Sequence, residues 1–112
     1  MAKLEATLHG NFSAILNAID TAVLEGSFTA SMEDESHFQS SSGRCVLRVY
    51  ERYSALGGNR VSLNLTLVED SGRIFVSAIT SGGSQAVLFK INTLGEGAFL
   101  DCVAELLDGW EG

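Results

Sequence analysis

The sequence predicts an α+β domain in which a mainly antiparallel, twisted sheet carries two helices on one face. Several short segments alternate apolar and polar residues, as half-buried strands do, because successive strand side chains point to opposite faces. Two other segments carry apolar residues at the three- and four-residue spacing of an amphipathic helix. The predicted order is β-α-β-β-β-β-β-α, in a single domain that spans residues 1–112.

The N-terminal part of the chain predicts the first three elements. Lys3–His9 alternates and predicts a short strand. Asn11 is a good N-cap, because its side chain can accept a hydrogen bond from a backbone N–H of the first helical turn. The helix ends near Gly26, and its apolar stripe is Phe12, Ile15, Leu16, Ile19 and Val23. Ser27–Glu33 predicts a second strand, whose inward residues are Phe28, Ala30 and Met32.

A polar, serine-rich segment follows at Asp34–Gly43, and this composition is typical of a surface loop. Phe38 interrupts it and has two interpretations. Either the second strand extends beyond Glu33, or the loop binds a partner. The sequence leaves both open.

The centre of the chain predicts four strands joined by short turns. The strands are Arg44–Ser54, Arg60–Val68, Arg73–Thr80 and Ser84–Asn92. The turns contain Gly-Gly-Asn, Asp-Ser-Gly and Gly-Gly, whose residues tolerate the positive φ of hairpin turns. The predicted pairs across them are Ser54 with Arg60, Val68 with Arg73, and Thr80 with Gln85. These pairs place on one face the apolar residues Leu47, Val49, Leu63, Leu65, Val76, Ala78, Val87 and Phe89. A one-residue slip would scatter this set.

A second helix is predicted from about Leu94 to near Gly109. Thr93 and Glu96 have the spacing of a capping box. The apolar stripe is Phe99, Leu100, Val103, Leu106, Leu107 and Trp110. Both helices need the same apolar sheet surface, so we expect them on one face. The element order is similar in outline to helix-grip and TBP-like architectures.

The predicted register turns an unusual set of residues toward the other face. It combines arginine, aromatic, aliphatic and amide side chains, a composition typical of interface cores. The candidate binding residues on this face are Arg48, Tyr50, Arg52, Asn64, Ser77, Leu88 and Lys90.

Three interpretations of this face remain open. It could be an interaction surface that pairs with a second copy, giving a homo-oligomer, or with another protein. It could hold a small anionic ligand or a peptide. It could also be an ordinary solvated face whose arginines pair with Glu51, Glu69 and their neighbours. We therefore expect a non-enzymatic binding or self-associating module. The alternative is a small-molecule enzyme or sensor that uses Arg48, Arg52 and Asn64, and the sequence does not decide whether the protein is an enzyme.

Composition limits the partners and the compartment. The net charge of −7 argues against general nucleic-acid binding, because phosphates would be repelled. No apolar run is long enough to span a membrane, and the N-terminus lacks the layout of a signal peptide. Cys45 and Cys102 lie on predicted apolar faces, which favours buried, reduced thiols. We expect a cytoplasmic protein.

No catalytic residues, cofactor or metal site are predicted. The histidines and cysteines are far apart in sequence, and no serine nucleophile motif is present. Glu51 departs from the alternating pattern, because the predicted register points it toward the apolar face. Since it lies near a strand end, we expect it to reach solvent or Arg60; a buried Glu51 would have a perturbed pKa.

Three segments resemble a known family of small bacterial proteins. They are Arg48–Ser54, Asn59–Asn64 and Ser77–Asp101, and the last reads SAITSGGSQAVLFKINTLGEGAFLD. Members have about this length and are described only as a domain of unknown function. The resemblance covers essentially the whole chain and implies one cytoplasmic bacterial domain, without implying an activity, a cofactor or site residues.

Overall fold

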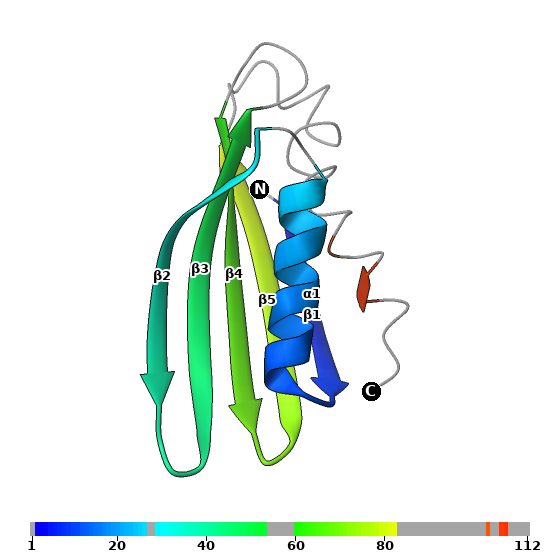
Figure 1. Cartoon of the computed structure of the whole chain (residues 1–112), viewed down its shortest axis with the longest axis vertical. Coiled ribbons are helices and arrows are strands. Elements are labelled where there is room, and N and C mark those ends of the chain that lie inside the picture. The colour runs from blue at the N-terminus through cyan, green and yellow to red at the C-terminus, as the bar shows by residue number, and fades with distance from the viewer. Residues whose placement is uncertain (1, 27–28, 54–59, 83–102, 104–105, 108–112) are drawn as a thin grey trace.

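The computed structural model describes residues 2–26, 29–53, 60–82, 103 and 106–107 of the 112-residue chain. These residues form one sheet and a helix that packs on one of its faces and runs roughly along the strands (Figure 1). The elements are β1 (Ala2–His9), α1 (Phe12–Glu25), β2 (Ser31–Gln39), β3 (Gly43–Tyr53), β4 (Arg60–Asp70) and β5 (Arg73–Gly82). The predicted α+β class with a mainly antiparallel sheet is confirmed.

The five-stranded sheet has the order β1-β5-β4-β3-β2, and every neighbouring pair is antiparallel. The first two strands of the chain therefore lie at opposite edges of the described sheet. The β1-α1-β2 connection crosses the whole sheet, and this crossing lays α1 over one face (Figure 1).

Helix α1 forms where the sequence predicts it. The Asn11 side chain accepts a hydrogen bond of 2.8 Å from the backbone N–H of Ala14, which satisfies one of the free donors of the first turn. Gly26 caps the other end, and its N–H donates to the carbonyl of Ala22. The predicted stripe is buried: Phe12, Ile15, Leu16, Ile19 and Val23. The amphipathic pattern therefore fixed both the extent of the helix and its inward side.

Strand β2 begins and ends later than predicted. It runs over Ser31–Gln39, so most of the expected loop at residues 34–43 is strand, and Phe38 lies within it. This outcome matches the interpretation in which the second strand extends further. The chain then turns at residues 40–42, where the Ser40 N–H donates to the Gly43 carbonyl. The polar composition misled the prediction because β2 is an edge strand, almost fully exposed, with little apolar pattern to recognise.

The predicted register between β3 and β4 is wrong by one residue. Tyr53, not Ser54, pairs with Arg60. As a result Arg48 lies beside Leu65 and Tyr50 beside Leu63, on the same face as α1. A one-residue shift moves every β3 side chain to the opposite face. The sequence could not specify the face, because β3 carries large apolar residues on both: Val46 and Tyr50 on one, Leu47 and Val49 on the other.

The register between β4 and β5 differs from prediction by two residues, which leaves the faces unchanged. Asp70 pairs with Arg73, and the turn between them is Ser71-Gly72. Ser71 and Gly72 have φ values of 54° and 82°, the two positive values that a two-residue type I′ hairpin turn requires. Leu65 and Leu67 therefore pair with Ala78 and Val76 on the predicted face.

The predicted strand Ser84–Asn92 lies outside the described residues. The edge of β5 to which it was assigned is occupied by β1, whose Leu4 and Ala6 pair with Ala78 and Val76. Most of the predicted second helix also lies outside the described residues. Of that segment Val103, Leu106 and Leu107 are described, and Val103 and Leu107 are buried.

The core fills the space between α1 and the sheet. Its sheet residues are Val46 and Tyr50 of β3, Val61, Leu63, Leu65 and Leu67 of β4, and Ile74, Val76 and Ala78 of β5. Leu4, Ala6 and Leu8 of β1 pack against them. Among the described residues, no helix has the length and apolarity that crossing a membrane would require.

Candidate functional site

The two faces of the sheet have different surroundings. The face toward α1, here the covered face, contains the core. The other, here the open face, consists of Lys3, Glu5, Thr7 and His9 of β1; Arg73, Phe75, Ser77, Ile79 and Ser81 of β5; Arg60, Ser62, Asn64, Thr66, Val68 and Asp70 of β4; Gly43, Cys45, Leu47, Val49, Glu51 and Tyr53 of β3; and Ser31, Asp34, Ser36 and Phe38 of β2. The alternation of strand side chains places all of them on one side.

Large hydrophobic side chains are concentrated on the open face. Six are exposed among the described residues: Met32, Phe38, Leu47, Tyr53, Phe75 and Ile79. All except Met32 lie on the open face. Their exposed fractions run from 36% for Ile79 to 66% for Phe38. Isolated exposed apolar residues are ordinary, whereas a contiguous group on one face is typical of an interaction site.

The pairing registers arrange the open face in rows that cross all five strands. One row reads Lys3, Ile79, Asn64, Val49 and Asp34, from β1 to β2. The next row reads Glu5, Ser77, Thr66, Leu47 and Ser36. The third reads Thr7, Phe75, Val68, Cys45 and Phe38. The centre of the face is therefore apolar or small and uncharged, and charged residues lie toward its margins.

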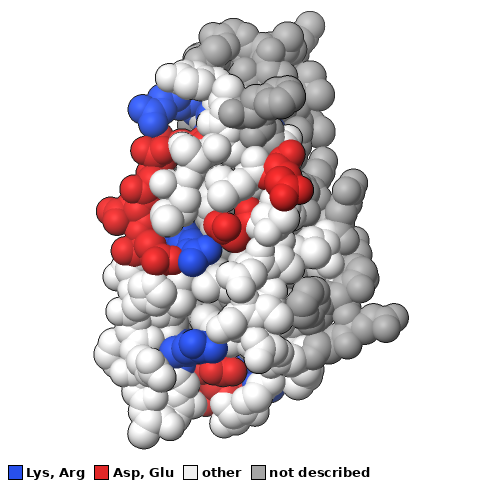
Figure 2. Space-filling model, viewed as in Figure 1, with Lys and Arg blue, Asp and Glu red and all other residues white. Residues whose placement is uncertain are grey.

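Charge on the open face is nearly balanced, although the protein carries a net charge of −7. Its basic residues are Lys3, Arg60 and Arg73, and its acidic residues are Glu5, Asp34, Glu51 and Asp70. Acidic side chains are prominent instead along β2 and α1, seen from the covered side (Figure 2). A second copy would thus meet less charge repulsion at the open face than the net charge suggests.

A hollow opens beside the third row. It has a volume of about 310 Å³ and lies near the β2–β3 turn. Phe38, Cys45 and Val68, which are adjacent in that row, form its apolar wall. Backbone and polar side chains near the turn complete the lining. Such a concave apolar site suits an aromatic or aliphatic side chain.

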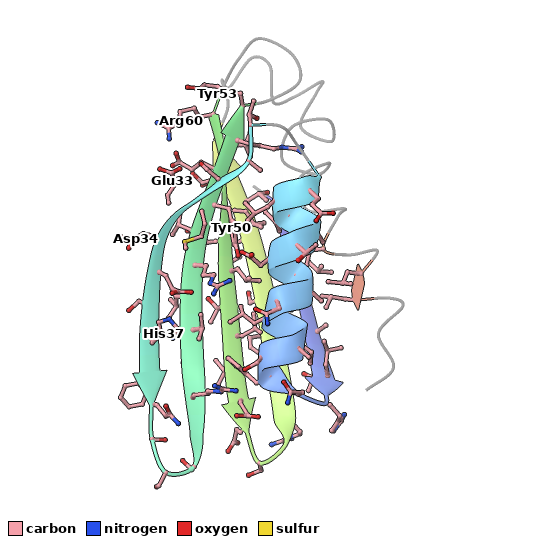
Figure 3. All side chains as sticks on the ribbon, in the orientation of Figure 1. Glu33, Asp34, His37, Tyr50, Tyr53 and Arg60 are labelled. Atoms are coloured by element: carbon pink, nitrogen blue, oxygen red, sulfur yellow. The ribbon has the colours of Figure 1, made fainter. Side chains whose placement is uncertain are left out.

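The covered face contains a polar cluster within its apolar surroundings. The Tyr50 hydroxyl donates a 2.7 Å hydrogen bond to Asp20 Oδ1 of α1, and Arg48 Nη1 donates to the same oxygen at 3.2 Å. Arg48 Nε donates to Glu35 of β2, whose other oxygen lies 2.8 Å from His37 Nε2. We call these residues, Asp20, Glu35, His37, Arg48 and Tyr50, the Arg48 cluster. In Figure 3, Tyr50 lies beside α1 and His37 on β2.

The surroundings of the Arg48 cluster favour the charged form of the Glu35 carboxyl and the neutral form of the Tyr50 phenol. Hydrogen bonds from His37 and Arg48 hold the pKa of the Glu35 carboxyl below its ordinary value of 4.5, because they stabilise the carboxylate. Burial, and then the hydrogen bond to Asp20, raise the pKa of the Tyr50 phenol above its ordinary value of 10.0. The phenol therefore remains a donor, and the cluster links α1, β2 and β3 across the sheet.

The structure separates the residues that the sequence grouped into one site. Arg48, Tyr50 and Arg52 lie on the covered face, whereas Asn64 and Ser77 lie on the open face. Leu88 and Lys90 lie outside the described residues. The prediction of a joint face is wrong for β3, because the one-residue register shift turned its arginines toward α1. Asn64 and Ser77 both remain candidate partner-binding residues. Asn64 is exposed, whereas Ser77 is only 8% exposed between its larger neighbours on β5, Phe75 and Ile79.

The arginines are engaged by acids of the same chain. Arg48 is only 15% exposed and contacts Asp20 and Glu35. Arg44 lies 3.5 Å from Glu69, and Arg60 forms an ion pair with Glu51. The expectation that Glu51 reaches Arg60 is confirmed, and the true register removes its departure from the pattern, because Glu51 belongs to the open face. These contacts leave Arg48 poorly placed to bind an anionic ligand.

Sequence reasoning missed Phe38, Leu47 and Val49 as residues of the open face. It also missed Asp20 and Glu35 as partners of Arg48. The sequence does contain two signals, Asp20 within the helix pattern and Arg48 within an apolar strand. Their contact depends on how α1 packs on β3, which the sequence pattern does not show. Within the described residues, no group of His, Cys, Asp or Glu side chains is large enough to hold a metal ion.

Fold and site together define a small α+β domain with one face of its antiparallel sheet covered and the other open. The chain belongs to a family of unknown function (DUF6054), whose model matches residues 1–111. No curated protein matches the sequence.

Proposed function

We propose that this protein is a non-enzymatic interaction domain that self-associates through its open face. The observation that carries the proposal is the concentration of exposed hydrophobic side chains there, with Phe38, Leu47 and Phe75 among them. Burying them against a second copy would remove apolar surface from water, which is the main driving force of association.

The size of the open face suits a dimer. Over the 8 residues of β1, the shortest strand, five strands spaced about 4.8 Å apart with about 3.3 Å per residue present a surface of about 600 Å². Two such faces bury about 1,200 Å² in total, which lies at the lower end of the range for specific interfaces. Sheets that stack face to face in this way form the core of β-sandwiches.

Association through the sheet edges is less favourable. Edge strand β2 contains an irregularity between Met32 and Asp34, and an acidic run surrounds it. Edge strand β1 carries Lys3 and Glu5. Bulges and charges on edge strands oppose the addition of a further strand. Among the described surfaces, the open face therefore remains the best candidate.

The test compares two exposed hydrophobic residues on opposite faces. Leu47→Lys places a charge in the centre of the open face. Met32→Lys makes the same kind of change on the covered side, where Met32 pairs with Tyr50. Each added lysine brings the net charge of −7 closer to zero. A loss of association would therefore not result from greater overall charge repulsion between copies.

Sedimentation equilibrium between about 1 and 100 μM measures the outcome, since interfaces of this size commonly associate in that range. We expect the wild type and Met32→Lys to form dimers and Leu47→Lys to be a folded monomer by circular dichroism. A wild type that stays monomeric throughout, or a Leu47→Lys variant that dimerises like the wild type, would contradict the proposal.

A further inference from the structure

We infer that the two copies pack with their two-fold axis parallel to the strands and running over β4. This inference rests on the proposed self-association and adds its geometry. A two-fold axis in the interface plane can run along the strands or across them. The first choice places β1 over the partner's β2 and keeps each row facing itself. The second keeps each strand facing itself and exchanges the rows.

Charge distinguishes the two arrangements. Lys3 and Asp34 stand at opposite ends of one row. With the axis along the strands, Lys3 of each copy faces Asp34 of the other, which gives two equivalent ion pairs. With the axis across the strands through the middle row, Glu5 faces its own counterpart and Asp34 faces the ring of Phe38. The axis across the strands thus supplies no opposite charge to Asp34, whereas the axis along the strands pairs it with Lys3.

Shape supports the same choice. In the row Thr7, Phe75, Val68, Cys45 and Phe38, the positions of Phe75 and Cys45 are symmetric about β4. The axis along the strands therefore brings Phe75 of one copy over Cys45 of the other. Cys45, Val68 and Phe38 form the apolar wall of the 310 Å³ hollow. Phe75 is 39% exposed and would fill this hollow, as an aromatic anchor does at the centre of many interfaces.

The remaining positions are compatible with this arrangement. Ile79 faces Val49 of the second copy, and Ser77 faces Leu47. Asn64, Thr66 and Val68 of β4 each face their own counterpart across the axis. Asp70 and Arg60 also face their own counterparts, but they lie at the two ends of β4. Each has an oppositely charged partner in its own chain, because Arg73 is 3.8 Å from the Asp70 carboxylate and Arg60 forms an ion pair with Glu51. The charged contacts thus fall at the rim, where solvent reaches them.

A charge swap tests the arrangement. Lys3→Asp alone, or Asp34→Lys alone, replaces two attractive contacts per dimer by two repulsive ones. We expect each single variant to raise the dimer dissociation constant about tenfold, the sum of two exposed ion-pair effects. The double variant Lys3→Asp/Asp34→Lys exchanges the partners and should restore wild-type affinity. Phe75→Ala should weaken the dimer more than Ile79→Ala, because it alone leaves the hollow empty.

The outcomes separate this inference from the proposed function. If the wild type dimerises and Leu47→Lys does not, but the double variant is no tighter than the single ones, the two-fold arrangement is wrong while the open face remains the interface. If the wild type is monomeric, both proposals fail. Recovery in the double variant, together with the larger effect of Phe75→Ala, supports the axis along the strands.

Discussion

The covered and open faces of this sheet both carry apolar and polar side chains, but the two faces differ in how far these side chains are buried. On the covered face, the core residues of β3, β4 and β5 are buried, and the charged Arg48 is surrounded by groups that form hydrogen bonds with it. On the open face, Leu47 and Phe75 are exposed among serine, threonine and asparagine. The covered face thus completes its contacts within one chain. Among the described residues, the open face keeps large apolar side chains exposed, and this difference is the basis of the proposed self-association.

The largest difference between the faces should appear when one leucine on each is truncated. Leu65→Ala on the covered face removes a side chain that is 1% exposed, and we expect a loss of about 3 kcal/mol in the free energy of unfolding. Leu47→Ala on the open face removes one that is 46% exposed, and we expect less than about 1 kcal/mol. Urea unfolding at a concentration that keeps the chain monomeric measures both. Equal losses would mean that the open face is covered within the monomer.

A smaller effect should follow from removing the cation of the Arg48 cluster. Arg48→Met leaves Asp20 and Glu35 without the guanidinium that both contact. We expect a loss of about 2 kcal/mol in the free energy of unfolding, because unpaired carboxylates then remain in a partly buried place. Arg73→Met is the matched control: its ion pair with Asp70 is 63% exposed on both sides, and we expect about 0.5 kcal/mol or less. If both variants lose the same amount, the Arg48 cluster is no more than a surface ion pair.

The smallest expected effect is a dependence on pH. Since the folded pKa of Glu35 is lowered, its carboxylate contributes stability that is present above the unfolded value and is lost as pH falls through the folded value. Wild type should therefore exceed Glu35→Gln by about 1 kcal/mol or less at neutral pH. The difference should begin to shrink below the ordinary pKa of 4.5. Unfolding curves at several pH values measure it, with Glu33→Gln on the same strand as the control for removing a charge. A difference that stays constant down to acidic pH would contradict the assignment of this contact.

Much of the fold could be predicted because its signals are local. The stripe of α1, the cap at Asn11 and the alternation of Val61, Leu63, Leu65 and Leu67 each depend on neighbouring residues alone. The predicted pairing between β4 and β5 differs from the observed one by two residues. A shift by an even number of residues leaves each side chain on its predicted face. The extent of β2 was not predicted, because an exposed edge strand needs no apolar pattern. The candidate site was predicted only in part: a patterned outer face was expected, with Phe75, Ser77 and Ile79 on it, but its β3 residues were wrong.

By itself, the sequence determined which segments alternate, where α1 begins and ends, and that β4 and β5 share one apolar face. Tertiary structure decided which side of β3 joins that face. The physical reason is that β3 is apolar on both sides, so its faces differ little in the area they can bury. Packing against α1 favours the side on which Tyr50 and Arg48 reach Asp20, and that choice leaves Leu47 and Val49 on the open face.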